Sequence, residues 1–156
     1  MSMQKGHVEL GTIREAREQD LPGVEALLGS FNLAIAGVAQ HLPGFLVLED
    51  AGCIVASAGL ELYGSAALLR SVAVAEAFRN RGLGEAMVTQ LLHRARSKGV
   101  RTVYLLTTTA QQYFQRLGFE TVPRNAVDPA TTASAEFGDA CCATAVAMRR
   151  SLEGRG

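Results

Sequence analysis

A basic turn with two glycines lies between a short apolar strand and an amphipathic helix. Arg79, Gly82 and Gly84 mark this turn, which follows the apolar residues 72–75. The first N–H groups of a helix have no partner within the helix, and the helix dipole adds partial positive charge at that end. Glycines lack a Cβ and let a ligand approach the backbone closely. The pattern therefore predicts an anion-binding turn, most simply for a phosphate.

The residues after Gly84 exclude two other kinds of phosphate-binding loop. A P-loop requires Lys and Ser or Thr after its last glycine, whereas Glu85 and Ala86 follow here. A dinucleotide-binding fingerprint requires glycine or alanine three positions beyond Gly84, where Met87 stands.

The spacing Arg79-x-x-Gly82-x-Gly84 resembles the acetyl-CoA pyrophosphate loop of the GNAT superfamily of N-acetyltransferases. A second segment, 113–119, reads YFQRLGF and is similar to the second recurring motif of that superfamily. The resemblance implies an α/β (α+β) GNAT fold with a mixed, mostly antiparallel sheet of six or seven strands and about four flanking helices. It also implies acetyl-CoA as co-substrate, no metal, and a sheet splayed at a central parallel pair, here 66–74 and 103–107.

The same resemblance assigns the residues that would hold the cofactor. Backbone groups of Val72 and Val74 would pair with the pantetheine amides, an N–H within 72–74 would face the thioester oxygen, and the N–H groups of 79–84 would hold the pyrophosphate. The alternative for the two loop arginines is that they are merely solvated. The complete expected set is Val72, Ala73, Val74, Arg79, Asn80, Arg81, Gly82, Leu83, Gly84 and Phe114.

Many members of the superfamily place a tyrosine four residues before the glycine of the second motif, where it protonates the departing thiolate. Phe114 stands at that position here, and Tyr113 precedes it. A neighbouring residue projects about 100° away on a helix, so no catalytic tyrosine is assigned. A thiol with a pKa of about 8.5 can leave as a thiolate near neutral pH at a small cost in free energy, so the enzyme would not require a general acid.

Glu61 is the candidate general base, acting on the amine through water. If Gly64-Ser65 forms a two-residue turn, Glu61 lies opposite Leu68, and Arg70 falls on the same face of the hairpin. A bulge in the later strand would shift this register. Arg70 would then hold a substrate carboxylate, while the alternative is that Glu61 and Arg70 simply form a cross-strand ion pair.

Other substrate-binding candidates follow the ends of strands. Ser71 lies beside Arg70, and Thr107 and Thr108 end the strand 103–107, where ligands of open α/β sheets bind. The alternative is that one of these hydroxyls caps the helix that starts near Ala110.

Several segments are similar to a narrower branch that includes acetyltransferases encoded with arsenic-resistance genes and the acetyltransferase domain of N-acetylglutamate synthase. These are 105–110 with 113–119, then Ser134-x-Glu136-Phe137 and the run from Cys141 to Met148. The resemblance implies a small acceptor amine, an acidic amino acid or its phosphinic or arsinic analogue, and a homodimer. Two alternatives are a non-catalytic acetyl-CoA binder, which Phe114 favours, and an acetyltransferase acting on a protein or peptide.

Composition bounds the class of protein. The chain has 156 residues, of which 48% are hydrophobic and 19% charged, and its formal net charge is +0. These values predict one folded domain over 13–152 between short tails, 1–12 and 153–156, with no nucleic-acid partner. No apolar run reaches the roughly 20 residues of a membrane helix, and the first residues do not form a secretion signal, so we expect a cytoplasmic protein. The three cysteines lack zinc-site spacing.

Hydrophobic periodicity and turn residues predict the order of elements. Segment 31–44, rich in Ala and Gly, is expected to hold a short helix and to form a wall of the substrate pocket. A first helix is expected after Asp20 as N-cap, with an apolar stripe that runs to Leu28; other helices are expected over 84–98 and 110–117, with one turn near 136–137. Strands are expected over 13–16, 45–49, 53–63, 66–74, 103–107, near Thr121 and over 143–148.

Overall fold

The computed structural model describes residues 12–138 and 144–152, in which seven strands form one mixed sheet in the order β1-β2-β3-β4-β5-β7-β6. The strands are β1 (Arg14–Glu15), β2 (Phe45–Asp50), β3 (Cys53–Tyr63), β4 (Ala66–Val74), β5 (Thr102–Thr107), β6 (Glu120–Val122) and β7 (Val146–Ser151). Every neighbouring pair is antiparallel except β4 and β5, which are parallel. The expected mixed, mostly antiparallel sheet is confirmed.

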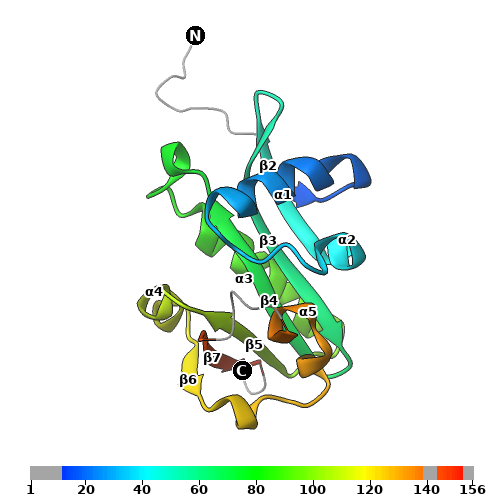
Figure 1. Ribbon diagram of the computed structural model, residues 1–156, viewed down its shortest axis with the longest axis vertical. Helices are drawn as coiled ribbons and strands as arrows, with labels where there is room; N and C mark the ends of the chain where they lie inside the picture. Colours follow the sequence, from blue (N-terminus) through cyan, green and yellow to red (C-terminus); the bar gives the residue numbers. More distant parts are fainter. Residues whose placement is uncertain (1–11, 139–143, 153–156) are drawn as a thin grey trace.

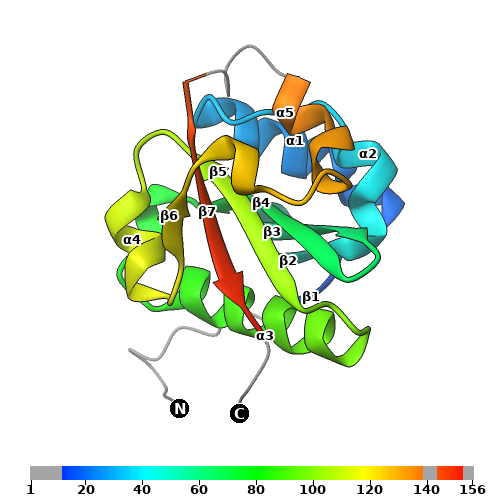
Figure 2. The same cartoon turned by 90° about the horizontal axis from the view of Figure 1, so that it is seen from below.

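Helices cover both faces of the sheet. Helix α3 runs along one face, and α1, α2 and α5 lie over the other (Figures 1 and 2). The α-helices are α1 (Leu21–Ser30), α2 (Val38–His41), α3 (Leu83–Ser97), α4 (Gln111–Arg116) and α5 (Ala135–Gly138). Single 3-10 turns occur at η1 (Glu18–Asp20), η2 (Leu42–Gly44), η3 (Glu76–Phe78), η4 (Arg124–Ala126) and η5 (Thr131–Ala133).

Strand β2 shows how alternation divides the core between the two faces. Leu46 and Leu48 pack in the cluster beneath α3, whereas Phe45 and Val47 pack in the cluster beneath α1 and α2. Successive side chains of a strand point to opposite faces, so one apolar strand serves two hydrophobic layers.

Helix α3 presents one apolar stripe to the sheet and begins directly after the glycine-bearing turn. Gly82 is its N-cap residue, with φ of 74°, a conformation that favours glycine. The buried stripe consists of Met87, Val88, Leu91, Leu92 and Ala95. Because this stripe fixes the helix on the sheet, the N-terminus of α3 is aimed at the carboxyl end of β4.

A bulge in β4 bends the strand beside the site. Glu61 pairs with Leu68 and Gly59 with Arg70, as the hairpin register predicts, but Ser57 then pairs with Ala73. Two residues of β4 therefore oppose one of β3 just beyond Arg70, and Ser71 takes a φ of 61° there. The predicted bulge is present, and it leaves the register between Glu61 and Arg70 unchanged.

Strands β4 and β5 separate soon after they pair. Their ladder extends only from Ala66 with Thr102 to Leu68 with Tyr104, and the two strands diverge beyond it (Figure 1). The predicted splay at the central parallel pair is confirmed.

The structure departs from the predicted elements in two places. Asp20 does not cap α1 with its side chain; its carboxylate accepts the N–H of Arg17 (2.7 Å) and so closes the preceding η1 turn. The last strand begins at Val146 rather than 143 and runs on to Ser151. The adjacent cysteines, Cys141 and Cys142, lie outside the described residues.

None of the described helices combines the length and apolarity that crossing a bilayer requires.

Candidate functional site

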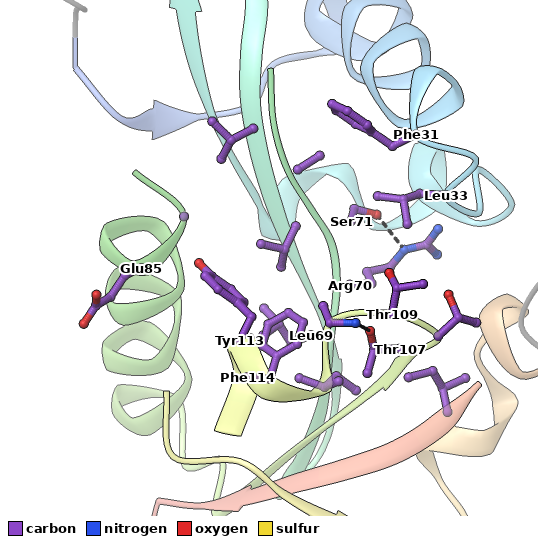
Figure 3. A pocket seen from close by; sticks show the side chains of 18 of the residues that line it. Phe31, Leu33, Leu69, Arg70, Ser71, Glu85, Thr107, Thr109, Tyr113 and Phe114 are labelled. Atoms are coloured by element: carbon purple, nitrogen blue, oxygen red, sulfur yellow. Dashed lines mark hydrogen bonds between the residues drawn. The ribbon is translucent and has the colours of Figure 1, made fainter. Parts of the chain in front are cut away.

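A pocket of about 720 Å³ occupies the gap between the splayed strands and extends to the N-terminus of α3 (Figure 3). One end is bordered by the glycine-bearing turn and the other by the bulge of β4, the end of β5 and α5. Its wall includes Phe31, Leu33, Ala34, Leu69, Arg70, Ser71, Val72, Ala73, Val74, Arg79, Asn80, Gly82, Leu83, Gly84, Leu105, Thr107, Thr108, Thr109, Tyr113, Phe114, Arg116, Glu136 and Ala145. As expected, part of segment 31–44 forms one wall.

The turn end of the pocket presents backbone donors and positive charge. Within the described part of the chain, the N–H groups of residues 80–85 have no backbone acceptor. The first backbone hydrogen bond of α3 is the one that Ala86 donates to Gly82. Arg79 and Arg116 border the same end. Glu85 also borders it, but its carboxylate points away from Tyr113 and Phe114 (Figure 3). The chemistry of this end suits the pyrophosphate of a coenzyme, and the narrow gap suits a slender arm.

The two loop arginines behave differently. Arg79 borders the pocket, stacks its guanidinium 4.8 Å from the centre of the Phe31 ring and donates from Nε to the carbonyl of Val74 (3.0 Å). Arg81 is absent from the pocket wall and lies over the Phe78 ring at 5.4 Å. Arg79 thus clamps the turn to the end of β4, while Arg81 lies outside the pocket in this arrangement.

Tyr113 and Phe114 both border the pocket. Their rings meet edge to face with centroids 5.1 Å apart, and Phe114 packs further against Phe119. A Cβ at Gly84 would lie 2.5 Å from the Tyr113 hydroxyl oxygen and 3.6 Å from the ring carbon that bears it. The absence of a side chain at Gly84 therefore leaves room for the tyrosine as well as for a ligand, and burial raises the pKa of Tyr113.

We expect Gly84→Ala to weaken acetyl-CoA binding about tenfold, because the new methyl group overlaps the Tyr113 hydroxyl and displaces it toward the pocket. Tyr113→Phe removes only the oxygen and leaves ordinary contact with the methyl group. The double variant should therefore recover most of the affinity of Tyr113→Phe alone, as measured by calorimetric titration. If Gly84→Ala lowers acetyl-CoA affinity by the same factor in the wild type and in the Tyr113→Phe protein, overlap with the Tyr113 hydroxyl is not the cause.

Arg70 is enclosed at the other end of the pocket. Its side chain is fully buried, and its guanidinium donates to Ser71 Oγ (3.0 Å), Glu61 Oε2 (2.8 Å) and the carbonyls of Ala34 (3.0 Å) and Ala36 (2.7 Å). Four of the five N–H groups of Arg70 are thereby engaged. The guanidinium links β4 to the backbone of the pocket wall formed by segment 31–44.

Glu61 lies behind Arg70 and is not among the residues of the pocket wall. It is fully buried, forms an ion pair with Arg70 and accepts a short hydrogen bond from the Tyr63 hydroxyl. Burial opposes ionisation of Glu61, but the hydrogen bonds from Tyr63 and Arg70 outweigh it and hold its pKa below the usual value. The cross-strand ion pair expected as one of two interpretations is therefore present.

Two further side chains complete this buried cluster. His41 Nε2 lies 3.7 Å from Glu61 Oε1. Burial, followed by the bond to Glu61, raises the pKa of Tyr63 to about 12. The contact of His41 could not be recognised in the sequence, because His41 lies in α2 and reaches β3 only through the packing of segment 31–44.

The polar residues near the end of β5 divide into two groups. Thr107 is nearly buried, and its Oγ1 accepts the N–H of Ala110 (3.0 Å), so it fixes the entry to α4 as the capping interpretation expects. Thr108 and Thr109 are exposed and border the pocket. Ser71 is nearly buried, with its hydroxyl engaged by Arg70.

Among the pocket residues that were not predicted as site residues, two are charged residues from the second half of the chain. Arg116 comes from α4, where it lies over the Tyr113 ring at 5.9 Å, and Glu136 comes from α5. Both stand in segments that carry the family resemblance, but their approach to the pocket depends on how α4 and α5 pack on the sheet.

Comparison with known proteins agrees with this geometry. The profile of the acetyltransferase (GNAT) family matches residues 12–119. An amino-acid acetyltransferase of Pseudomonas fluorescens is 29% identical over 119 residues, 69% of this chain and 27% of that protein. An uncharacterised N-acetyltransferase of Chlorobaculum tepidum is 24% identical over 120 residues, 72% of this chain and 77% of its own length. The chain thus spans about a quarter of the amino-acid acetyltransferase.

Solved structures show the same fold. N-acetylglutamate synthase from Neisseria gonorrhoeae, complexed with coenzyme A and L-arginine, has a TM-score of 0.76 at 21% identity over 92% of this chain and 33% of that one. A Mycobacterium tuberculosis protein in complex with CoA and NLQ has a TM-score of 0.75 at 23% identity, covering 91% of this chain and 99% of that one. The chain therefore belongs to the acetyltransferase (GNAT) family of N-acetyltransferases.

Proposed function

We propose that the chain transfers the acetyl group of acetyl-CoA to the primary amine of a small amino acid in a ternary complex. The observation that carries this proposal is the single pocket that joins an anion-binding turn to a small polar end through the gap between β4 and β5. The relatives named amino-acid acetyltransferases support the acceptor class. Acidic amino acids and their phosphinic or arsinic analogues are the acceptors we expect within it.

The cofactor would lie with its pyrophosphate at residues 79–84 and its pantetheine arm along Val72–Val74. Because β4 does not pair with β5 beyond Leu68, the backbone of Val72, Ala73 and Val74 can meet the arm instead of a neighbouring strand. An N–H of this stretch would stabilise the oxyanion that forms at the thioester carbonyl.

The transfer step needs a neutral amine and an outlet for the thiolate. The amine nitrogen attacks the carbonyl carbon, the C–N bond forms, and the C–S bond breaks with its electron pair leaving on sulfur. Phe114 cannot protonate the thiolate, so the proton lost by the amine nitrogen reaches it through solvent. The modest basicity of a thiolate makes this outlet adequate.

The substrate-side residues predicted from the sequence enter this proposal with distinct roles. Thr108, exposed at the end of β5, would contact the acceptor directly, while Ser71 and Thr107 would support the pocket wall through the bonds they already make. Because a guanidinium does not relay protons, Glu61 could act as a base only after movement of segment 31–44 opened a path to it. Arg70 would meet a substrate carboxylate only through its remaining N–H.

The proposal is tested by thiol release from acetyl-CoA in the presence of a panel of amines. The panel contains glutamate, aspartate, phosphinic and arsinic amino-acid analogues, an arylamine, a polyamine and a lysine-bearing peptide. We expect turnover with the acidic amino acids or their analogues. Turnover with the peptide alone would replace this function with protein acetylation. No turnover, together with a melting temperature raised by acetyl-CoA, would indicate a non-catalytic cofactor binder.

A further inference from the structure

We propose that Glu136 is the carboxylate that binds the ammonium group of the acceptor and takes up its proton, an assignment that rests on the proposed acetyl transfer. Glu136 borders the acceptor end of the pocket on the side opposite the glycine-bearing turn, together with Arg70, Ser71 and Thr107. Its residue surface is 6% exposed, so a ligand that reaches it is largely removed from water.

The local backbone holds Glu136 in place. Ser134 ends the η5 turn, and its Oγ accepts the N–H of Glu136 (3.1 Å) at the first turn of α5. The Glu136 Oε2 atom lies 3.5 Å from Nε of Arg70, which is itself fixed by the Ala34 and Ala36 carbonyls. The carboxylate is therefore positioned by two independent parts of the chain.

The charges around Arg70 favour a cationic ligand. Glu61 and Glu136 flank one guanidinium, and Glu61 makes the shorter ion pair, 2.8 Å against 3.5 Å. Glu61, Glu136 and Arg70 taken by themselves carry a formal charge of −1, and of the two acidic residues Glu136 is the one on the pocket wall. A buried negative charge of this kind is stabilised by an ammonium group.

The remaining charged residues on the pocket wall serve the other end. Arg79, Glu85 and Arg116 border the turn and α4, within the described part of the chain. The pocket therefore has a positive end suited to phosphates and a negative end suited to an amine. This polarity draws the acceptor nitrogen toward Glu136, and the thioester of a cofactor lying along residues 72–74 would have to reach it there.

Proton transfer follows from this placement. The acceptor ammonium gives one proton to the Glu136 carboxylate, and the neutral amine then attacks the thioester carbon. The second proton of the nitrogen leaves as the amide forms, and the departing thiolate takes up one proton from solvent. The net products are the acetylated amine, the free thiol of CoA and one proton.

The test compares Glu136→Gln with Glu120→Gln, a matched carboxylate-to-amide change at an exposed site on β6. Each amine of the panel is titrated into the protein saturated with free CoA, which permits binding without chemistry, and turnover is measured separately with acetyl-CoA. We expect Glu136→Gln to weaken amine binding about tenfold to a hundredfold and to raise the amine KM, with CoA affinity unchanged. Glu136→Asp should recover part of the loss.

Glu61→Gln tests the alternative that Glu61, and not Glu136, binds and deprotonates the acceptor amine. If Glu61 binds or deprotonates the acceptor, its variant loses amine affinity as strongly as Glu136→Gln does, and the assignment falls. Wild-type amine affinity in a folded Glu136→Gln protein also overturns it. Glu136-dependent amine binding without turnover in the wild type would contradict the proposed function while supporting the assignment, and no amine binding at all would overturn both.

Discussion

Arg70→Met is expected to destabilise the protein by about 3–5 kcal/mol, because it leaves a buried carboxylate without its counter-charge. Glu61 is fully buried and pairs with Arg70, and the same guanidinium satisfies the carbonyls of Ala34 and Ala36. For a domain of this size the loss corresponds to a fall in melting temperature of roughly 6–20 °C, measured by calorimetry at neutral pH.

A surface ion pair provides the control. Arg94 pairs with Glu15, and their side chains are 41% and 66% exposed, so Arg94→Met should cost no more than about 1 kcal/mol. Replacing Glu61 by Leu together with Arg70→Met removes both charges and should recover part of the stability. Equal melting temperatures for Arg70→Met and Arg94→Met would show that the buried pair is not a major source of stability.

Gly44→Ala is expected to cost about 3 kcal/mol, since the added Cβ would lie 2.3 Å from the backbone carbonyl oxygen of Leu60. A backbone atom in a central strand cannot move aside as the end of a side chain can. Gly44 closes η2, the turn that joins the pocket wall to β2, and Leu60 precedes Glu61. The substitution should therefore also raise the KM for the acceptor amine, which steady-state kinetics would measure alongside chemical denaturation.

Gly29→Ala is the matched substitution with the opposite expected sign. Gly29 lies in α1, and its Cβ would meet only Ile35 at 3.8 Å, an ordinary contact. Alanine in a helix is favoured over glycine by about 0.5–1 kcal/mol, so this variant should be at least as stable as the wild type. Similar losses in both variants would mean that the close approach at Gly44 is not the cause.

Local patterns were sufficient for most of the elements. The apolar stripe of α3 and the runs of β3, β4 and β5 repeat at their own periods, and those periods reflect which face of each element is buried. The two-residue turn at Gly64-Ser65 fixed the register that sets Glu61 opposite Leu68. Asp20 stands at the predicted N-cap position of α1, but its carboxylate closes the adjacent η1 turn instead of bonding to the α1 backbone, because it can reach either turn.

The turn from Arg79 to Gly84 was the part of the site that the sequence could predict, since it acts mainly through backbone groups and needs glycines at fixed places. The set of groups that surround Arg70 could not be predicted from the sequence. Its partners come from segment 31–44, β3, the bulge of β4 and α5, which are distant along the chain.

The sequence by itself thus determined the family, the order of elements and the glycine-bearing turn at which we propose that the cofactor binds, because each rests on short-range periodicity and backbone conformation. Only the tertiary structure decided the charge of the acceptor end. The net charge around Arg70 depends on which carboxylates pack against its guanidinium. The fold buries Glu61 behind Arg70 and places Glu136 on the pocket wall.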